Sequence, residues 1–152
     1  MKELVSIDEV LDAQWDQLTD EAALDDVHLS LQSLIAAARS DAALAKLYPF
    51  VSMGRLCFSR CTDFPYYVDV LISPKDPVDE KYLVEITIGR GGWVDTIAVH
   101  EVSRAKDAAN SASSILPKGY GYARLGDADK WREEFDGEAS TFRKLQPNLE
   151  EN

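Results

Sequence analysis

The chain has 152 residues, a net charge of −11 from 27 acidic and 16 basic residues, and a hydrophobic content of 45%. These values indicate one globular domain rather than a disordered chain, and no apolar run approaches the roughly 20 residues that cross a membrane. Because a strongly acidic surface repels phosphate, we expect a basic protein as partner rather than a nucleic acid or a membrane. No signal-peptide core is present near the start, so we expect a cytoplasmic protein.

The N-terminal third of the chain predicts three helices. Ser6 and Glu9 have the spacing of a capping box, so a helix should begin at residue 7. Its apolar stripe recurs at helical spacing and comprises Ile7, Val10, Leu11 and Leu18, with Trp15 at the margin. A second helix is predicted over residues 26–38. A short third helix, capped by Ser40, should run to residue 47 and stop before Pro49.

The side of the first predicted helix opposite this stripe is acidic. Residues 1–53 contain ten acids against three bases, and four of these acids fall on that side: Asp8, Glu9, Asp12 and Asp16. Like charges four residues apart on a helix cost about 0.2–0.5 kcal/mol per pair, a cost that is either tolerated or used. We predict that these four residues bind the basic partner.

The middle of the chain predicts an antiparallel sheet. Strands are expected over residues 56–61, 66–73, 82–88 and 93–99, and the second and third of these alternate between apolar and polar positions. This alternation assigns one set of residues to the face covered by helices: Tyr66, Val68, Val70, Ile72, Tyr82, Val84, Ile86 and Ile88. Tyr67, Asp69 and Glu85 should lie on the other face.

Two further helices complete the predicted order. One should run from a Ser103 cap to Leu116, and a short one should follow an Asp127 cap over residues 128–135. The whole pattern predicts an α+β fold with N-terminal helices, a four-stranded antiparallel meander, a helix packed on one sheet face and a short C-terminal helix. We expect a single domain over residues 1–136 and a loosely ordered tail over residues 137–152.

Two motifs resemble functional sites but have simpler interpretations. Residues 89–92, with the sequence Gly-Arg-Gly-Gly, look like a phosphate loop, yet they join two predicted strands and no helix follows to complete an anion site. We interpret them as a hairpin turn. The two histidines, His28 and His100, have no metal-ligand spacing, so we predict no metal and no cofactor.

Three carboxylates provide the most specific enzymatic hypothesis. By alternation, Asp69, Glu85 and Asp95 share the sheet face opposite Val70 and Ile86. Paired carboxylates support acid–base catalysis or bind a divalent metal. The same pattern is typical of a solvated sheet face, where nothing shifts a carboxyl pKa, so we expect no convergence and assign no catalytic residue.

The two cysteines are predicted to be reduced thiols. Cys57 and Cys61 lie four residues apart in one predicted strand, which separates them by roughly 13 Å, beyond the reach of a disulfide. Each would be a nucleophile only with a base beside it, and no pattern in the sequence supplies that base.

Several segments together resemble a known family. These segments are residues 47–52 (Leu-Tyr-Pro-Phe-Val-Ser), residues 58–65 (Phe-Ser-Arg-Cys-Thr-Asp-Phe-Pro) and residues 116–121 (Leu-Pro-Lys-Gly-Tyr-Gly). They are similar to a mainly actinobacterial family labelled natural-product biosynthesis proteins, and the likeness covers roughly residues 5–126. Met53 stands where that family's Ser-His pair has a histidine. The resemblance implies an accessory or small-molecule-handling role, with a pocket between the sheet and the helices.

Three functions therefore compete. The acidic N-terminal third favours a non-enzymatic binding module, such as an immunity protein that neutralises or escorts a basic bacterial protein, for example a toxin. The family resemblance favours a role in a biosynthetic cluster. The third hypothesis is an enzyme that uses Asp69, Glu85 and Asp95. Genomic neighbourhood distinguishes the first two, because a toxin gene favours immunity and tailoring genes favour biosynthesis.

Overall fold

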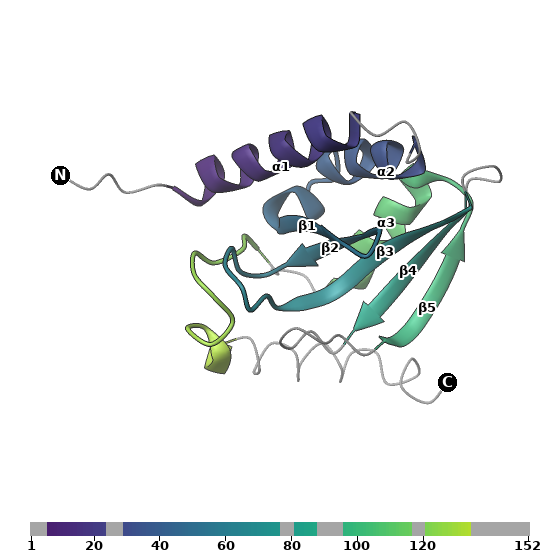
Figure 1. Cartoon of the computed structure of the whole chain (residues 1–152). Helices are drawn as coiled ribbons and strands as arrows, with labels where there is room; N and C mark the ends of the chain where they lie inside the picture. The colour runs from purple at the N-terminus through teal and green to yellow at the C-terminus, as the bar shows by residue number, and fades with distance from the viewer. Residues whose placement is uncertain (1–5, 24–28, 77–80, 88–95, 117–120, 135–152) are drawn as a thin grey trace.

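A computed structural model describes residues 6–23, 29–76, 81–87, 96–116 and 121–134 (Figure 1). Its elements, in chain order, are α1 (Ile7–Ala23), α2 (Leu29–Arg39), the 3-10 helix η1 (Leu44–Lys46), β1 (Tyr48–Ser52), β2 (Arg55–Ser59), β3 (Val68–Asp76), β4 (Lys81–Thr87), β5 (Thr96–Val102) and α3 (Ala105–Ile115). The strands form one antiparallel sheet in the order β1-β2-β3-β4-β5. The predicted α+β fold is confirmed, with five strands rather than four.

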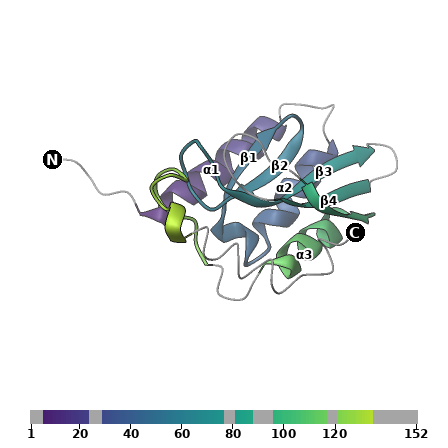
Figure 2. The ribbon, with the colours of Figure 1, turned by 90° about the horizontal axis from the view of Figure 1, so that it is seen from below.

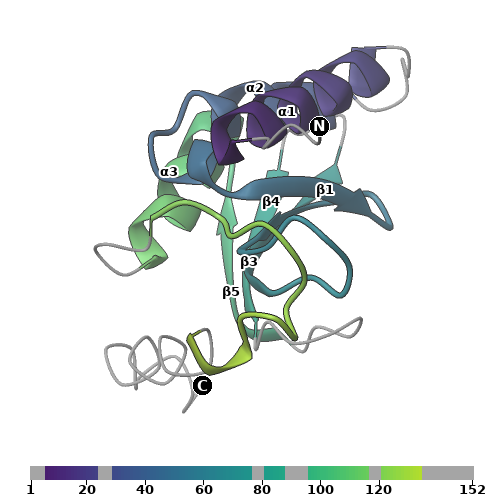
Figure 3. The same ribbon diagram turned by 90° about the vertical axis from the view of Figure 1, so that its left-hand side faces the viewer.

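The helices cover one face of this sheet. Figure 3 shows α1 and α2 above β1, and Figure 2 shows the strands crossing in front of these helices when the molecule is seen from below. The strand residues in the buried cluster shared with the helices are Leu56, Phe58, Val70, Ile72, Tyr82 and Val84. The predicted inward alternation is thus confirmed for the two residues of β3 and the two of β4 in this list. The side chain of Ile86 and the whole of Ile88 lie outside the described part of the chain.

Trp15 attaches helix α1 to the sheet, although the sequence pattern placed it at the margin of the apolar stripe. The buried residues of α1 are Leu11, Trp15, Leu18 and Ala22. Trp15 is 1% exposed, its ring lies 6.4 Å from that of Phe58, and its indole Nε1–H donates to the carbonyl of Ala45 at 3.3 Å. Trp15 is therefore at the centre of the buried stripe and not at its margin.

Strand β1 is an element that the sequence pattern did not predict. The short helix predicted up to residue 47 shrinks to η1, where Asp41 Oδ1, rather than the hydroxyl of Ser40, accepts the amides of Ala43 and Leu44 at 2.9 and 3.1 Å. Pro49 does not merely stop this helix, because it lies within β1. Proline is tolerated there because β1 is an edge strand, whose outer side needs no ladder hydrogen bond. The Pro49 carbonyl instead accepts a hydrogen bond from Gln14 Nε2 of α1 at 2.8 Å.

A bulge between β2 and β3 reverses part of the predicted alternation. Phe58 pairs with Val70 whereas Ser59 pairs with Val68, so one extra residue of β3 lies between the two pairs. Successive strand residues point to opposite faces of a sheet. The extra residue therefore reverses the face to which the side chains of the preceding residues point. Val68 and Tyr66 accordingly pack with Leu71 rather than with the helices, and the prediction was wrong for both.

The C-terminal predictions have mixed outcomes. Helix α3 begins after Arg104, whose side chain makes no capping hydrogen bond, so the predicted Ser103 cap was wrong. Asp127 Oδ1 accepts the amide of Lys130 at 2.9 Å, as predicted for a cap, but residues 128–131 form a turn and the described helical residues are 132–134, so the helix predicted from residue 128 starts later. The predicted tail over residues 137–152 lies outside the described residues.

Candidate functional site

The outward side of α1 carries a row of carboxylates, referred to below as the acidic face. All six acids of the helix are exposed, and the helix contains no basic residue; the six are Asp8, Glu9, Asp12, Asp16, Asp20 and Glu21. They face solvent because the apolar stripe centred on Trp15 occupies the opposite side. The hydroxyl of Ser6 accepts a hydrogen bond from the amide of Glu9 at 3.2 Å, so the predicted cap is confirmed. It lies next to the first turn, which contains Asp8 and Glu9.

Little within the described structure neutralises this acidic face. Arg39 Nη2 of α2 binds Asp16 Oδ1 at 2.7 Å, and both side chains are substantially exposed. Among the described residues, no other basic side chain forms an ion pair with an acid of α1. The four residues predicted from the sequence to bind a partner, Asp8, Glu9, Asp12 and Asp16, are thus brought together on one solvent-facing side. Their role in binding stays a prediction.

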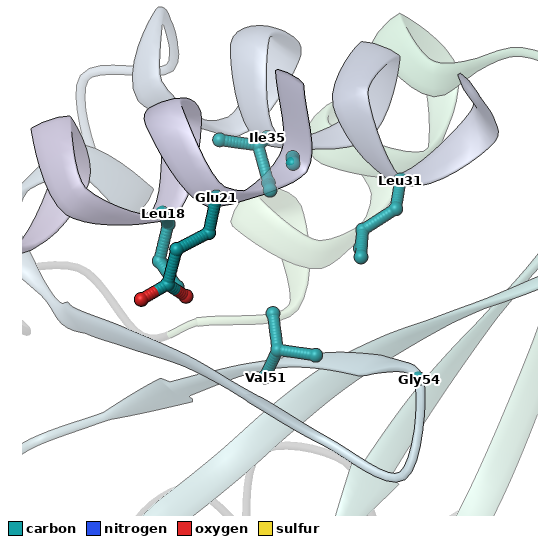
Figure 4. Close-up of a pocket in the computed structure, with 7 residues that line it drawn as sticks. Leu18, Glu21, Leu31, Ile35, Val51 and Gly54 are labelled. Atoms are coloured by element: carbon teal, nitrogen blue, oxygen red, sulfur yellow. The ribbon is translucent and has the colours of Figure 1, made fainter. Parts of the chain in front are cut away.

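A pocket lies beside the acidic face (Figure 4). It has a volume of about 260 Å³ and is formed by α1, α2 and the β1–β2 hairpin; its lining residues are Leu18, Glu21, Ala22, Leu31, Ile35, Val51 and Gly54. Glu21 supplies the carboxylate of this otherwise apolar wall, and its Oε1 accepts a hydrogen bond from Gln17 Nε2 at 3.0 Å.

The hairpin beside this pocket ends in an exposed methionine. Met53 and Gly54 both have positive φ, at 54° and 76°, and they join the paired residues Ser52 and Arg55. A two-residue turn with both φ values positive matches the twist of a hairpin, and glycine, asparagine and aspartate are the residues that adopt it readily. Met53 is 90% exposed there. This hairpin was not predicted from the sequence, although a Met-Gly pair between two apolar segments was the available signal.

Both cysteines are buried, and burial disfavours their reactive thiolate form. Burial raises the pKa of Cys57 to about 12, against the lowering effect of nearby Arg55, and Glu85 raises it further. Burial likewise raises the pKa of Cys61, against the lowering effect of its hydrogen bond with Ser59. Both thiols are therefore protonated near neutral pH, and the prediction of free, reduced cysteines is confirmed.

The segment that carries the family resemblance most specifically is a structural junction. Ser59 is fully buried, and its Oγ donates to the carbonyl of Cys61 at 2.7 Å while accepting the amides of Cys61 and Tyr67 at 3.1 and 3.3 Å. Cys61 also forms a parallel bridge with Arg124, and the amides of Thr62 and Arg124 donate to the carbonyls of Arg124 and Arg60. The junction thus fastens the segment after α3 to the end of β2.

Replacing Ser59 with alanine should lower the free energy of unfolding by about 1–3 kcal/mol, because it leaves two buried amides without their acceptor. Ser114→Ala is the matched control, since that hydroxyl bonds to an exposed carbonyl on the surface of α3 and its loss should cost less than about 0.5 kcal/mol. Urea denaturation followed by circular dichroism measures both. Equal losses in the two variants would contradict a structural role for Ser59.

The structure describes only part of the proposed carboxylate cluster. Glu85 is half-buried in β4 and its Oε2 accepts a hydrogen bond from Ser73 Oγ at 2.7 Å. The side chain of Asp69 and the whole of Asp95 lie outside the described residues. His28 and residues 89–92 lie outside them as well, and His100 is described only by its strand pairing with Val84. Within the described part of the chain, no group of three or more potential metal ligands occurs.

Comparisons with known proteins identify the family. Within the described residues, no helix has the length and apolar character that a bilayer crossing requires. Searches of curated proteins and of solved structures found no match. One family model matches residues 9–127, nearly the range over which the sequence resemblance was noted. Because this match covers more than half of the chain, the protein belongs to DUF6193, a family of unknown function.

Proposed function

We propose that this protein is a non-enzymatic binding module whose acidic face docks a basic protein, in the manner of an immunity protein that neutralises or escorts its partner. The observation that carries the proposal is the row of six exposed carboxylates on α1, with Arg39 as their cationic neighbour in the described structure. A row of like charges raises the local concentration of a basic partner and speeds its association. The two buried, protonated thiols offer no competing nucleophile.

Reversing charges on the acidic face should slow association with the partner. The variant Asp12→Lys with Asp16→Lys raises the net charge by four units at the centre of this face. We expect the association rate constant at low salt to fall about tenfold and its dependence on salt to weaken, because exposed charges act mainly by steering. Stopped-flow or surface plasmon resonance measures the rate with the purified basic protein that is encoded beside this chain or recovered with it.

A matched control separates local from overall charge. Asp129→Lys with Glu133→Lys adds the same four units at exposed positions in the segment after α3. This variant should associate at nearly the wild-type rate. Equal rates for the two variants, or a wild-type association rate that does not change with salt, would remove the acidic face from the interface and overturn the proposal.

The resemblance to natural-product biosynthesis proteins supports a second candidate, a small-molecule-handling role in a biosynthetic cluster. The pocket between the helices and the β1–β2 hairpin is the feature that favours it. Its volume of about 260 Å³ is below the roughly 300–1,000 Å³ typical of pockets for drug-sized ligands, which is why we rank this role second. Tailoring-enzyme genes beside this one, with no gene for a basic protein, would reverse the order.

A further inference from the structure

Two features of the β1–β2 hairpin point to an apolar contact beside the acidic face. Met53 extends from the tip at 90% exposure, and Val51 is 37% exposed on the pocket wall. A methionine at positive φ is strained, so folding alone would favour asparagine or glycine at this position. Its flexible thioether is well suited to packing against a partner.

The pocket adds a charge to this apolar surface. Glu21 of α1 contributes a carboxylate to the wall of this pocket (Figure 4). Asp20 is the next acid along the helix and is exposed. A ligand with an apolar group and a neighbouring positive charge would therefore pack against the apolar lining and form an ion pair with the Glu21 carboxylate.

We propose that this pocket receives one aliphatic side chain of the basic partner, with a neighbouring lysine or arginine bound to Glu21 and with Met53 packed against the partner's backbone. This inference rests on the proposed function, and it names the chemistry of the partner: an aliphatic residue flanked by basic ones. The pocket volume favours a single side chain over a drug-sized molecule. The acidic face steers the partner, and the pocket retains it.

Two short peptides test the inference even before the partner protein is identified. One is a blocked pentapeptide with a leucine between two pairs of lysines (KKLKK), and the other has alanine in place of leucine (KKAKK), so that their charges are equal. We expect the leucine peptide to bind about tenfold more tightly in NMR titrations at low salt, because it buries additional methyl and methylene groups. Equal affinity of the wild-type protein for the two peptides would overturn the inference.

Variants of the pocket sharpen the test. Ala22→Leu fills the pocket and should abolish the preference for the leucine peptide. Met53→Asn relieves the strained turn, so it should raise the melting temperature of the protein while weakening its binding of the leucine peptide severalfold. A residue with a purely structural role would not change stability and affinity in opposite directions.

Glu21→Gln should weaken binding of the leucine peptide more than its matched control Asp20→Asn does. A preference for leucine that survives both Ala22→Leu and Met53→Asn would contradict the assignment.

The same titrations separate this inference from the proposed function. If Asp12→Lys with Asp16→Lys weakens both peptides while the wild-type protein does not distinguish leucine from alanine, the acidic face binds cations and the pocket inference alone fails. If that variant binds both peptides as tightly as the wild type, the proposed function fails.

Discussion

Replacing Trp15 with alanine should lower the free energy of unfolding by about 3–5 kcal/mol. The indole is 1% exposed, packs near Phe58 and donates a hydrogen bond to Ala45, so the substitution leaves a large cavity between α1 and the sheet and removes that bond. Urea denaturation followed by circular dichroism measures the loss. Because α1 carries the acidic face, this side chain also determines how that face is presented.

Trp15→Phe separates the two contributions of the indole. The variant retains an aromatic ring next to Phe58 but cannot donate to the Ala45 carbonyl. We expect it to lose only about 1–2 kcal/mol, since most of the buried apolar volume remains. If Trp15→Ala cost less than about 1 kcal/mol, α1 would not depend on this residue for its attachment to the sheet.

The protein should lose stability steeply between pH 9 and pH 11 through Cys57. Its pKa is about 12 in the folded protein because the thiol is buried, whereas its ordinary value is 9.0. Below pH 9 the thiol is protonated in both states and contributes no pH dependence. Above pH 9 the unfolded chain releases a proton that the folded protein keeps, so the free energy of unfolding falls by up to about 1.4 kcal/mol per pH unit.

A variant without this thiol isolates the effect. The other groups that titrate above pH 9, including Tyr48 and Tyr66, are common to the wild type and Cys57→Ala. Urea denaturation of both proteins from pH 8 to pH 11, in the presence of a reductant, gives the difference directly. We expect the wild type to lose about 2–3 kcal/mol more than the variant by pH 11. Parallel curves would show that Cys57 titrates normally in the folded protein.

The features that could be predicted well from the sequence are those with a local physical cause. The exposure of the four acids on α1 follows from helical periodicity, because the apolar residues at Leu11 and Leu18 fix which side is buried. The Ser6 cap and the inward alternation of Val70 and Ile72 are equally local. Each of these predictions needed only the residues of its own element.

The features that were missed depend on contacts between distant segments. The extra residue between β2 and β3 belongs to the pairing of the strands, so the reversal at Val68 is invisible in either strand alone. The strand around Pro49 was missed because proline argues against a strand until its position at the sheet edge is known. The short helix predicted up to residue 47 is reduced to Leu44–Lys46 for the same kind of reason, since strand pairing already begins at Tyr48.

The candidate site likewise has one part that could be predicted from the sequence and one part that could not. The acidic face lies within one helix and could be predicted from spacing. The pocket requires Glu21 of α1, Ile35 of α2 and Val51 of β1 to meet, and no periodicity brings these three together. Met53 carried a local signal in its following glycine, but its exposure beside a pocket became apparent only from the fold.

The contact between Gln14 and Pro49 has a consequence for self-association. Edge strands can pair with the edge of another molecule and so start aggregation, because their outward amides and carbonyls still lack partners. At Pro49 the strand has no amide hydrogen to offer, and the Gln14 side chain already occupies the carbonyl. An incoming strand would therefore meet a break near the start of β1, so this end of the sheet edge is protected against edge-to-edge pairing without any added charge.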